Sequence, residues 1–221
     1  MDLLATDWST VSSLVTGAGT LVLAVATFAA VRSANRSARI AEIALQEQRR
    51  PVLAPSRLED QLQKLMFVDG HWISAAGGHA AAEHVDGSVY FGISLRNVGS
   101  GMAVCQGWAA RPGVSSSRSL PEHIAEQEFR GQTRDLYIPA GDVGLWQGAI
   151  RERSDPAHDE VARAISQHEP ISLELLYSDQ IGAQRTITRY TLVPVRRDDA
   201  DEGLRLLSGG RHWYLDRAGP R

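Results

Sequence analysis

The stretch WSTVSSLVTGAGTLVLAVATFAAV, which runs from Trp8 to Val31 near the start of the chain, is long and uncharged. It contains no Asp, Glu, Lys, Arg or His, and its most apolar part is Val11–Val31. As an α-helix this part would be about 31 Å long, which matches the hydrocarbon thickness of a bilayer. The stretch therefore predicts a helix that crosses a lipid bilayer through residues 8–31.

Two other interpretations of the stretch stay open. A buried core helix could be equally rich in Ala, Ser and Thr, although such helices seldom lack charge over six turns. A cleavable signal peptide would use the small residues of Ala26–Ala30 for cleavage. The flanks do not suit a signal peptide, because Asp2 and Asp7 precede the apolar run and the basic residues follow it.

The basic residues around the stretch predict its orientation. Residues 1–7 carry no Lys or Arg. The segment after the stretch carries Arg32, Arg36, Arg39, Arg49 and Arg50. Because Lys and Arg are retained on the cytoplasmic side, we expect a single-pass protein of the inner (plasma) membrane with its N-terminus outside and its C-terminal domain in the cytoplasm. The lone Cys105 allows no intrachain disulfide, as expected for a protein domain in a reducing compartment.

Composition limits the remaining function classes. Residues 51–221 carry 18 of the 23 Lys and Arg residues and 22 of the 26 Asp and Glu residues, which is a net charge of −4. A mildly acidic domain lacks the basic surface that nucleic-acid binding needs, so we expect no nucleic-acid partner. About 170 residues follow the first 50, enough for one domain with a core.

Helical character continues past the apolar stretch, because residues 32–48 contain neither Gly nor Pro. The segment is consistent with a solvated stalk helix or with a short coiled coil, and Pro51 ends it. Small residues at Ser13 and Gly17, and at Ala26 and Ala30, would let a second helix approach. Self-association through span and stalk is therefore one expected partner interaction. The stalk residues with 4-3-4-3 spacing are Ala34, Ala38, Ala41, Leu45 and Gln48.

Beyond Pro51 the hydrophobic pattern changes to the period of a β-strand. Residues 88–96 alternate most clearly, the cluster 97–101 predicts a turn with glycines at positive φ, and residues 102–111 predict the returning strand. Residues 171–177 and 185–195 predict a hairpin around Asp179 and Gly182. Further strands are expected at 52–58, 64–68, 71–74, 136–138 and 143–150.

One helix is expected among the strands, with Asp155 as its cap, Pro156 at its first position and Val161, Ile165 and His168 on one face. Small residues predict mobile loops at 74–87 and 112–119, and charges predict a linker at 196–203 before a tail whose Trp213, Tyr214 and Leu215 suit an edge strand. The fold class is mainly β, an antiparallel immunoglobulin-like β-sandwich preceded by a transmembrane helix that continues into a stalk helix. The expected parts are an anchor (1–31), a basic stalk helix (32–50), the sandwich (51–195) and a linker with tail (196–221).

This order of parts resembles a bacterial group of uncharacterised single-pass proteins, common in actinobacteria, with an N-terminal span, a basic stalk helix and an immunoglobulin-like β-sandwich. The resemblance implies the architecture and no activity. It is carried by RIAEIALQEQRRPV (39–52), SLRNVGSGMA (94–103), IPAG (138–141) and LYSDQIG (176–182).

No motif predicts catalysis, a cofactor or a metal ion, so we assign no site residue of any of these kinds. The glycines of TGAGT (16–20) lack the third glycine of a dinucleotide fingerprint, and Ser100 lacks the nucleophile motif. We expect the thiol of Cys105 to be buried and inert, which is the ordinary state of a free cysteine on a strand. Three further groups of candidates have simple structural explanations. We expect His71, His79 and His84, beside Glu83, to be solvated loop histidines, and His158-Asp159 to be the start of a helix. Near His123 we expect a solvated helical face that comprises Glu122, Glu126 and Glu128.

Two functions from different classes remain. The first is a membrane-tethered cytoplasmic β-sandwich that acts as a binding or assembly module for an unknown protein partner, and that is not an enzyme. The alternative is an enzyme of unfamiliar type whose His and carboxylate residues are assembled by the fold. Histidines and carboxylates in a closed pocket would favour the enzyme.

Overall fold

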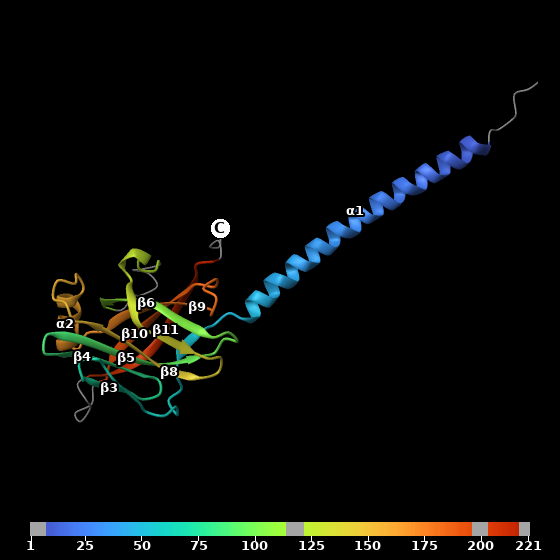
Figure 1. Ribbon diagram of the computed structural model, residues 1–221. Coiled ribbons are helices and arrows are strands. Elements are labelled where there is room, and N and C mark those ends of the chain that lie inside the picture. Colours follow the sequence, from blue (N-terminus) through green and yellow to red (C-terminus); the bar gives the residue numbers. More distant parts are fainter. Residues whose placement is uncertain (1–7, 114–121, 196–202, 217–221) are drawn as a thin grey trace, which may run out of the picture. The chain divides into compact units, whose positions relative to one another are not determined.

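The computed structural model describes residues 8–113, 122–195 and 203–216. The chain divides into two compact units, Met1–Gln48 and Arg49–Arg221. In the first unit, helix α1 (Trp8–Gln48) is continuous through the apolar stretch and the predicted stalk (Figure 1). The helical prediction for both segments is thus confirmed, while the coiled coil stays a prediction.

Helix α1 is long and apolar enough to cross a membrane over Val11–Gln48, and none of this span is buried within the structure. Three hydroxyls in the apolar part donate to backbone carbonyls four residues earlier: Thr16 to Ser12, Thr20 to Thr16 and Thr27 to Leu23. Such bonds satisfy the hydroxyls without water. The helix is therefore chemically suited to a hydrocarbon environment.

The second unit is a mainly antiparallel β domain with one large and one small sheet (Figure 1). The large sheet follows the order β1-β5-β4-β11-β10-β9-β6-β7, and β8 pairs with β5. Its strands are β1 (Leu53–Pro55), β4 (His79–Val85), β5 (Ser88–Asn97), β6 (Ala103–Pro112), β7 (Arg130–Ile138), β8 (Val143–Ile150), β9 (Ile171–Ser178), β10 (Thr186–Pro194) and β11 (Leu204–Tyr214). Strands β2 (Gln63–Met66) and β3 (Trp72–Ala75) form the small sheet, and the helical segments are η1 (Glu126–Glu128) and α2 (His158–Ser166).

The large sheet curls so that its two ends meet. The Trp146 indole of β8 donates to Gln132 Oε1 of β7, and Gln132 Nε2 donates to the Gln147 carbonyl. Inside the curl, Trp108 of β6 lies edge-on against both Phe91 of β5 (5.9 Å) and Trp146 (5.4 Å). Strands that are distant along the sheet thus share one aromatic core, on which α2 packs through Val161 and other buried residues.

Several predicted strands are confirmed, most closely 88–96, 143–150 and the hairpin of 171–177 with 185–195. The pairing of β6 was predicted wrongly, because β6 does not return beside β5 but pairs with β7 and β9. One edge of β5 carries β4 and then β1, and the other edge carries β8. No edge of β5 is left for β6.

Two segments predicted to lie outside the sheet belong to it. Residues 79–85, expected in a mobile loop, form β4, whose Ala80, Ala81 and Ala82 are buried. The tail forms β11, which is an interior strand between β10 and β4 and not an edge. The β domain consequently continues past residue 195. Most of the predicted linker at 196–203 and of the predicted loop at 112–119 lies outside the described residues, namely 196–202 and 114–119, and Pro112 is the last residue of β6.

Helix α2 begins two residues later than expected, with Ala157 as its N-cap. Asp155 still caps the turn, since its Oδ1 accepts a hydrogen bond from the Ala157 N–H at 2.9 Å. His168 does not share the buried face with Val161 and Ile165. It is exposed and adopts a left-handed φ of 53° just after the helix ends.

The turn at 97–101 differs in mechanism from its prediction, because neither Gly99 nor Gly101 has a positive φ. Both glycines instead let the chain after α1 pass at close range. A Cβ on Gly101 would lie 1.7 Å from the Arg49 carbonyl oxygen, and one on Gly99 would lie 2.4 Å from the Arg50 carbonyl oxygen. Glycine is required here for close backbone approach.

We therefore expect Gly101→Val to destabilise the domain through a steric clash with the Arg49 backbone. Overpacking of this kind costs about 1–3 kcal/mol, so the melting temperature should fall by roughly 2–10 °C in thermal melts followed by circular dichroism. The exposed neighbour Val98 provides a control, and Val98→Ala should leave the melting temperature nearly unchanged. Equal stability of Gly101→Val and the native chain would refute this role.

Candidate binding cleft

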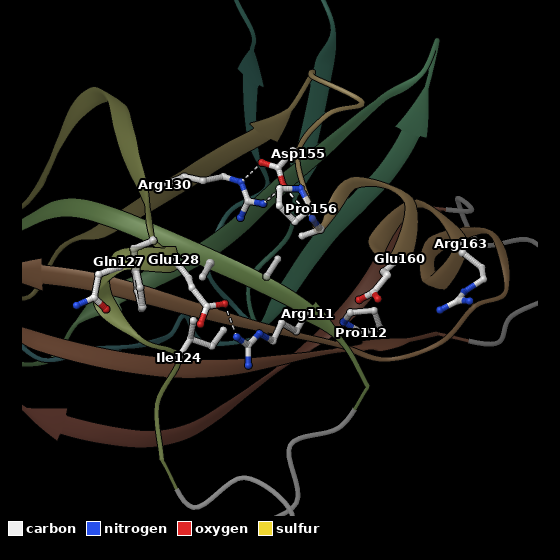
Figure 2. A pocket seen from close by; sticks show the side chains of 14 residues that line it. Arg111, Pro112, Ile124, Gln127, Glu128, Arg130, Asp155, Pro156, Glu160 and Arg163 are labelled. Carbon is white, nitrogen blue, oxygen red and sulfur yellow. Dashed lines mark hydrogen bonds and ion pairs between the residues drawn. The ribbon is translucent and has the colours of Figure 1, made fainter.

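A cleft of about 780 Å³ lies where the end of β6, the segment 124–130 and helix α2 meet (Figure 2). Strand β6 reaches it because its ladder with β7 ends at Trp108–Arg130, whereas its ladder with β9 continues to Pro112. Residues 109–112 thus extend beyond the last partner in β7 and form one wall. Helix α2 supplies the opposite wall with Ala157, Glu160 and Arg163.

The floor of the cleft is apolar and its rim is charged. Buried Ala109, Ala110 and Ile124 have side chains that leave room above the sheet, and three arginines and three carboxylates line the cleft around them (Figure 2). The apolar lining residues are Ala109, Ala110, Pro112, Ile124, Phe129, Pro156 and Ala157, and the charged ones are Arg111, Glu128, Arg130, Asp155, Glu160 and Arg163.

Four of the charged residues form two ion pairs across the cleft. Arg130 binds both carboxylate oxygens of Asp155, with Nε at 2.6 Å from Oδ2, and its guanidinium lies over the Trp108 ring. Arg111 donates to Glu128 at 2.5 Å. Burial opposes ionisation of Asp155, but hydrogen bonds from Arg130 and the Ala157 N–H outweigh it and hold the pKa of Asp155 below its usual value. Each of these two ion pairs therefore has no net charge.

The remaining charged residues of the rim, Glu160 and Arg163 on α2, are exposed and have no ion-pair partner among the described residues. Figure 2 shows both side chains on the α2 side of the cleft. An apolar floor with a few placed polar groups at its edge is typical of a surface that binds a ligand or a partner segment. Glu128 and Asp155 are already bound to arginines and join the walls of the cleft. This arrangement favours a role of the cleft in binding over a role in acid–base catalysis.

Helix α2 is attached to the sheet through His158, which is almost fully buried. Its Nδ1 lies 2.8 Å from Asp159 Oδ1, and its Nε2 lies 2.9 Å from the Gly87 carbonyl oxygen. Both partners are acceptors, so both ring nitrogens must carry protons for both bonds to form. The bond to Asp159, helped by the one to Gly87, raises the pKa of His158 despite its burial.

The other predicted candidates do not gather into one site. His71 pairs with Glu83 at 2.8 Å, but His79 bonds the Gly77 carbonyl and His84 only approaches the His158 ring, at 6.0 Å. Across the described residues no three His, Cys, Asp or Glu side chains converge as metal ligands. His79 and His84 lie on β4, so their prediction as loop residues was wrong, whereas His71 lies in the loop between β2 and β3 as predicted.

The remaining candidates have structural surroundings. Cys105 is buried in the core, and burial raises the pKa of its thiol to about 12. The TGAGT glycines lie within α1. Glu126 and Glu128 belong to the single turn of η1 and not to a longer helical face, and they pair with Arg185 and Arg111.

Comparison with known proteins adds no functional assignment. Neither the family models, nor the curated proteins, nor the solved structures that were searched include a match to this chain. The cleft was also not predicted from the sequence. Arg130 and Asp155 are 25 positions apart and lie in segments with no shared motif. The sequence signal for Asp155 was the Asp-Pro pair, which predicted a helix cap and not an ion pair.

The two hydrogen bonds of the His158 ring predict that the attachment of α2 depends on pH. A raised folded-state pKa contributes stability that is present below the ordinary value of 6.5 and is lost as pH rises through the folded value. The variant His158→Gln, which has no titrating ring, should melt below the native chain at pH 5.5, and the gap should narrow at pH 8.5. A gap that stays constant or widens would contradict the doubly protonated ring.

Proposed function

We propose that this protein is a membrane-tethered binding or assembly module, with its β domain on the cytoplasmic side of the plasma (inner) membrane and its N-terminus outside. The observation that carries the proposal is the exposed apolar surface of α1. Large side chains throughout its first part, among them Leu21, Leu23 and Phe28, are exposed by 67–69%. An apolar helix face of this length is unfavourable in water and stable in hydrocarbon.

The geometry of the β domain supports a binding role. Its cleft combines an apolar floor with charges that are already paired, and the two exposed charges on α2 stand at its edge. An unknown protein partner is the occupant that this surface suits, because the end of β6 offers strand backbone next to an apolar floor. We also propose that the β domain is an immunoglobulin-like sandwich. The contact of Phe91 on β5 with Trp108 on β6, inside one aromatic core, supports this form.

Self-association through span and stalk is the second part of the proposal. Because α1 is continuous, the 4-3 spacing of the stalk continues into the apolar stretch without a break. Every residue on this seam is uncharged and most are small, whereas all charges of residues 32–48 lie off it. The seam comprises Ser13, Gly17, Thr20, Ala24, Thr27, Val31, Ala34, Ala38, Ala41, Leu45 and Gln48.

Membrane insertion and orientation can be tested together. Alkaline carbonate should leave the protein in the membrane pellet, because an inserted helix is held by hydrophobic burial and not by charge. A fluorescent protein fused after Arg221 should be active, and alkaline phosphatase at the same place should be inactive. Release into the supernatant would refute the span, and active phosphatase would reverse the orientation.

The seam predicts a specific cross-link between two copies. A cysteine at Ala41, on the seam, should form a disulfide under mild oxidation in native membranes, whereas one at Ile43, on the far side of the helix, should not. Cys105 is buried and its thiol pKa is about 12, so the native thiol contributes no background. Equal dimer yields from Ala41→Cys and Ile43→Cys on non-reducing gels would count against the seam.

A further inference from the structure

A second pocket, which shares no lining residue with the cleft, lies where the small sheet packs over β4. It encloses about 340 Å³ and is lined by Lys64, Trp72, Ile73, Ser74 and Glu83. Its volume is at the lower end of the range for small-molecule sites, about 300–1,000 Å³.

The carboxylate of Glu83 is held in place by a supporting network. His71 Nε2 lies 2.8 Å from Glu83 Oε2, and the His71 ring stacks on Tyr90 at 4.2 Å. Tyr90 donates its hydroxyl hydrogen to Asp69, which also accepts from Arg151. These bonds outweigh burial and lower the pKa of Asp69 to about 2. The network fixes Glu83 through one oxygen and leaves Oε1 with no hydrogen-bond partner among the described residues.

Lys64 supplies a charge of the opposite sign to the same pocket. It lies on β2 directly across from Ser74 on β3, and none of the described carboxylates pairs with it. A carboxylate and an ammonium that line one pocket without pairing each retain their capacity for a charged partner. Charge-assisted hydrogen bonds to such a partner are among the stronger polar contacts in proteins.

Trp72 completes the pocket with an aromatic wall. Its side chain is 59% exposed although it lies on a strand, and Ile73 beside it is buried and anchors that strand. An exposed indole offers a flat apolar surface for an aliphatic group and a π face for an ammonium.

We propose that this pocket binds a small zwitterion, a free α-amino acid with an apolar side chain. The ligand carboxylate pairs with Lys64, the ligand ammonium pairs with Glu83 next to the indole, and the side chain packs on Trp72. A purely anionic ligand would face Glu83 and a purely cationic one would face Lys64, so each leaves a like charge opposed. The site is independent of the cleft and of the proposed function of the chain.

The test is isothermal titration calorimetry on the full chain in detergent micelles with four probes. L-Leucine should bind. N-acetyl-leucine, which lacks the ammonium, and leucinamide, which lacks the carboxylate, should bind at least about tenfold more weakly, as the loss of one charge-assisted bond predicts. Glucose, a neutral polyol, should give no heat of binding.

Variants separate the contributions. Lys64→Met and Glu83→Gln should each weaken leucine binding by roughly tenfold or more. Glu83→Gln should strengthen the weak binding of N-acetyl-leucine, because it removes the like charge that faces this anion. Trp72→Ala should also weaken leucine binding. Val68→Ala, an exposed neighbour outside the pocket, is the matched control and should bind as the native chain does. Absence of leucine binding, equal affinity for leucine and either modified form, or preferential binding of glucose would each overturn the proposal.

Discussion

The domain depends on how its first residues are held. Backbone groups that leave water must be paired inside the protein, and here buried side chains pair with the chain as it emerges from α1. Asn97 Oδ1 accepts from the Val52 N–H, Tyr177 accepts from the Leu53 N–H, and Tyr190 donates to the Leu53 carbonyl. Burial raises the pKa of Tyr177 to about 12 and raises that of Tyr190 well above its ordinary value of 10, so both phenols remain neutral partners.

The same buried asparagine joins further parts of the domain. Asn97 Nδ2 donates to the Gly101 carbonyl at 2.6 Å and to the Ile138 carbonyl at 2.8 Å, which ties the end of β5 to the end of β7. At the start of this segment, Arg50 binds Asp216 and lies over the Tyr214 ring at the end of β11. Side-chain contacts thus fix the start of the domain to β5, β9, β10 and the end of β11. The curl of the sheet, which brings β7 beside β8, allows β6 to extend past β7 and create the cleft.

Sequence patterns predicted the elements with strong periodicity and failed where packing decided the outcome. Residues 88–97 alternate clearly and form β5, and the run of 171–178 forms a fully buried strand. Strand β4 has no such signal, because its alanines are small enough to be covered on both faces. The partners of β6 depend on which edges of β5 other strands have already taken. The pairing of Arg130 with Asp155, and of His71 with Glu83, depends on how the fold brings together segments that are distant in the sequence. For Gly101 the sequence predicted a glycine requirement but not its cause.

The central claim is that the chain directly after α1 is part of the folded core and not a linker. Native-state hydrogen exchange of the Val52 and Leu53 amides tests it most directly, because their acceptors, Asn97 and Tyr177, are buried side chains. Both amides should exchange as slowly as those of β9, by global unfolding. Exchange near the rate of an unstructured peptide, while the β9 amides stay protected, would contradict it.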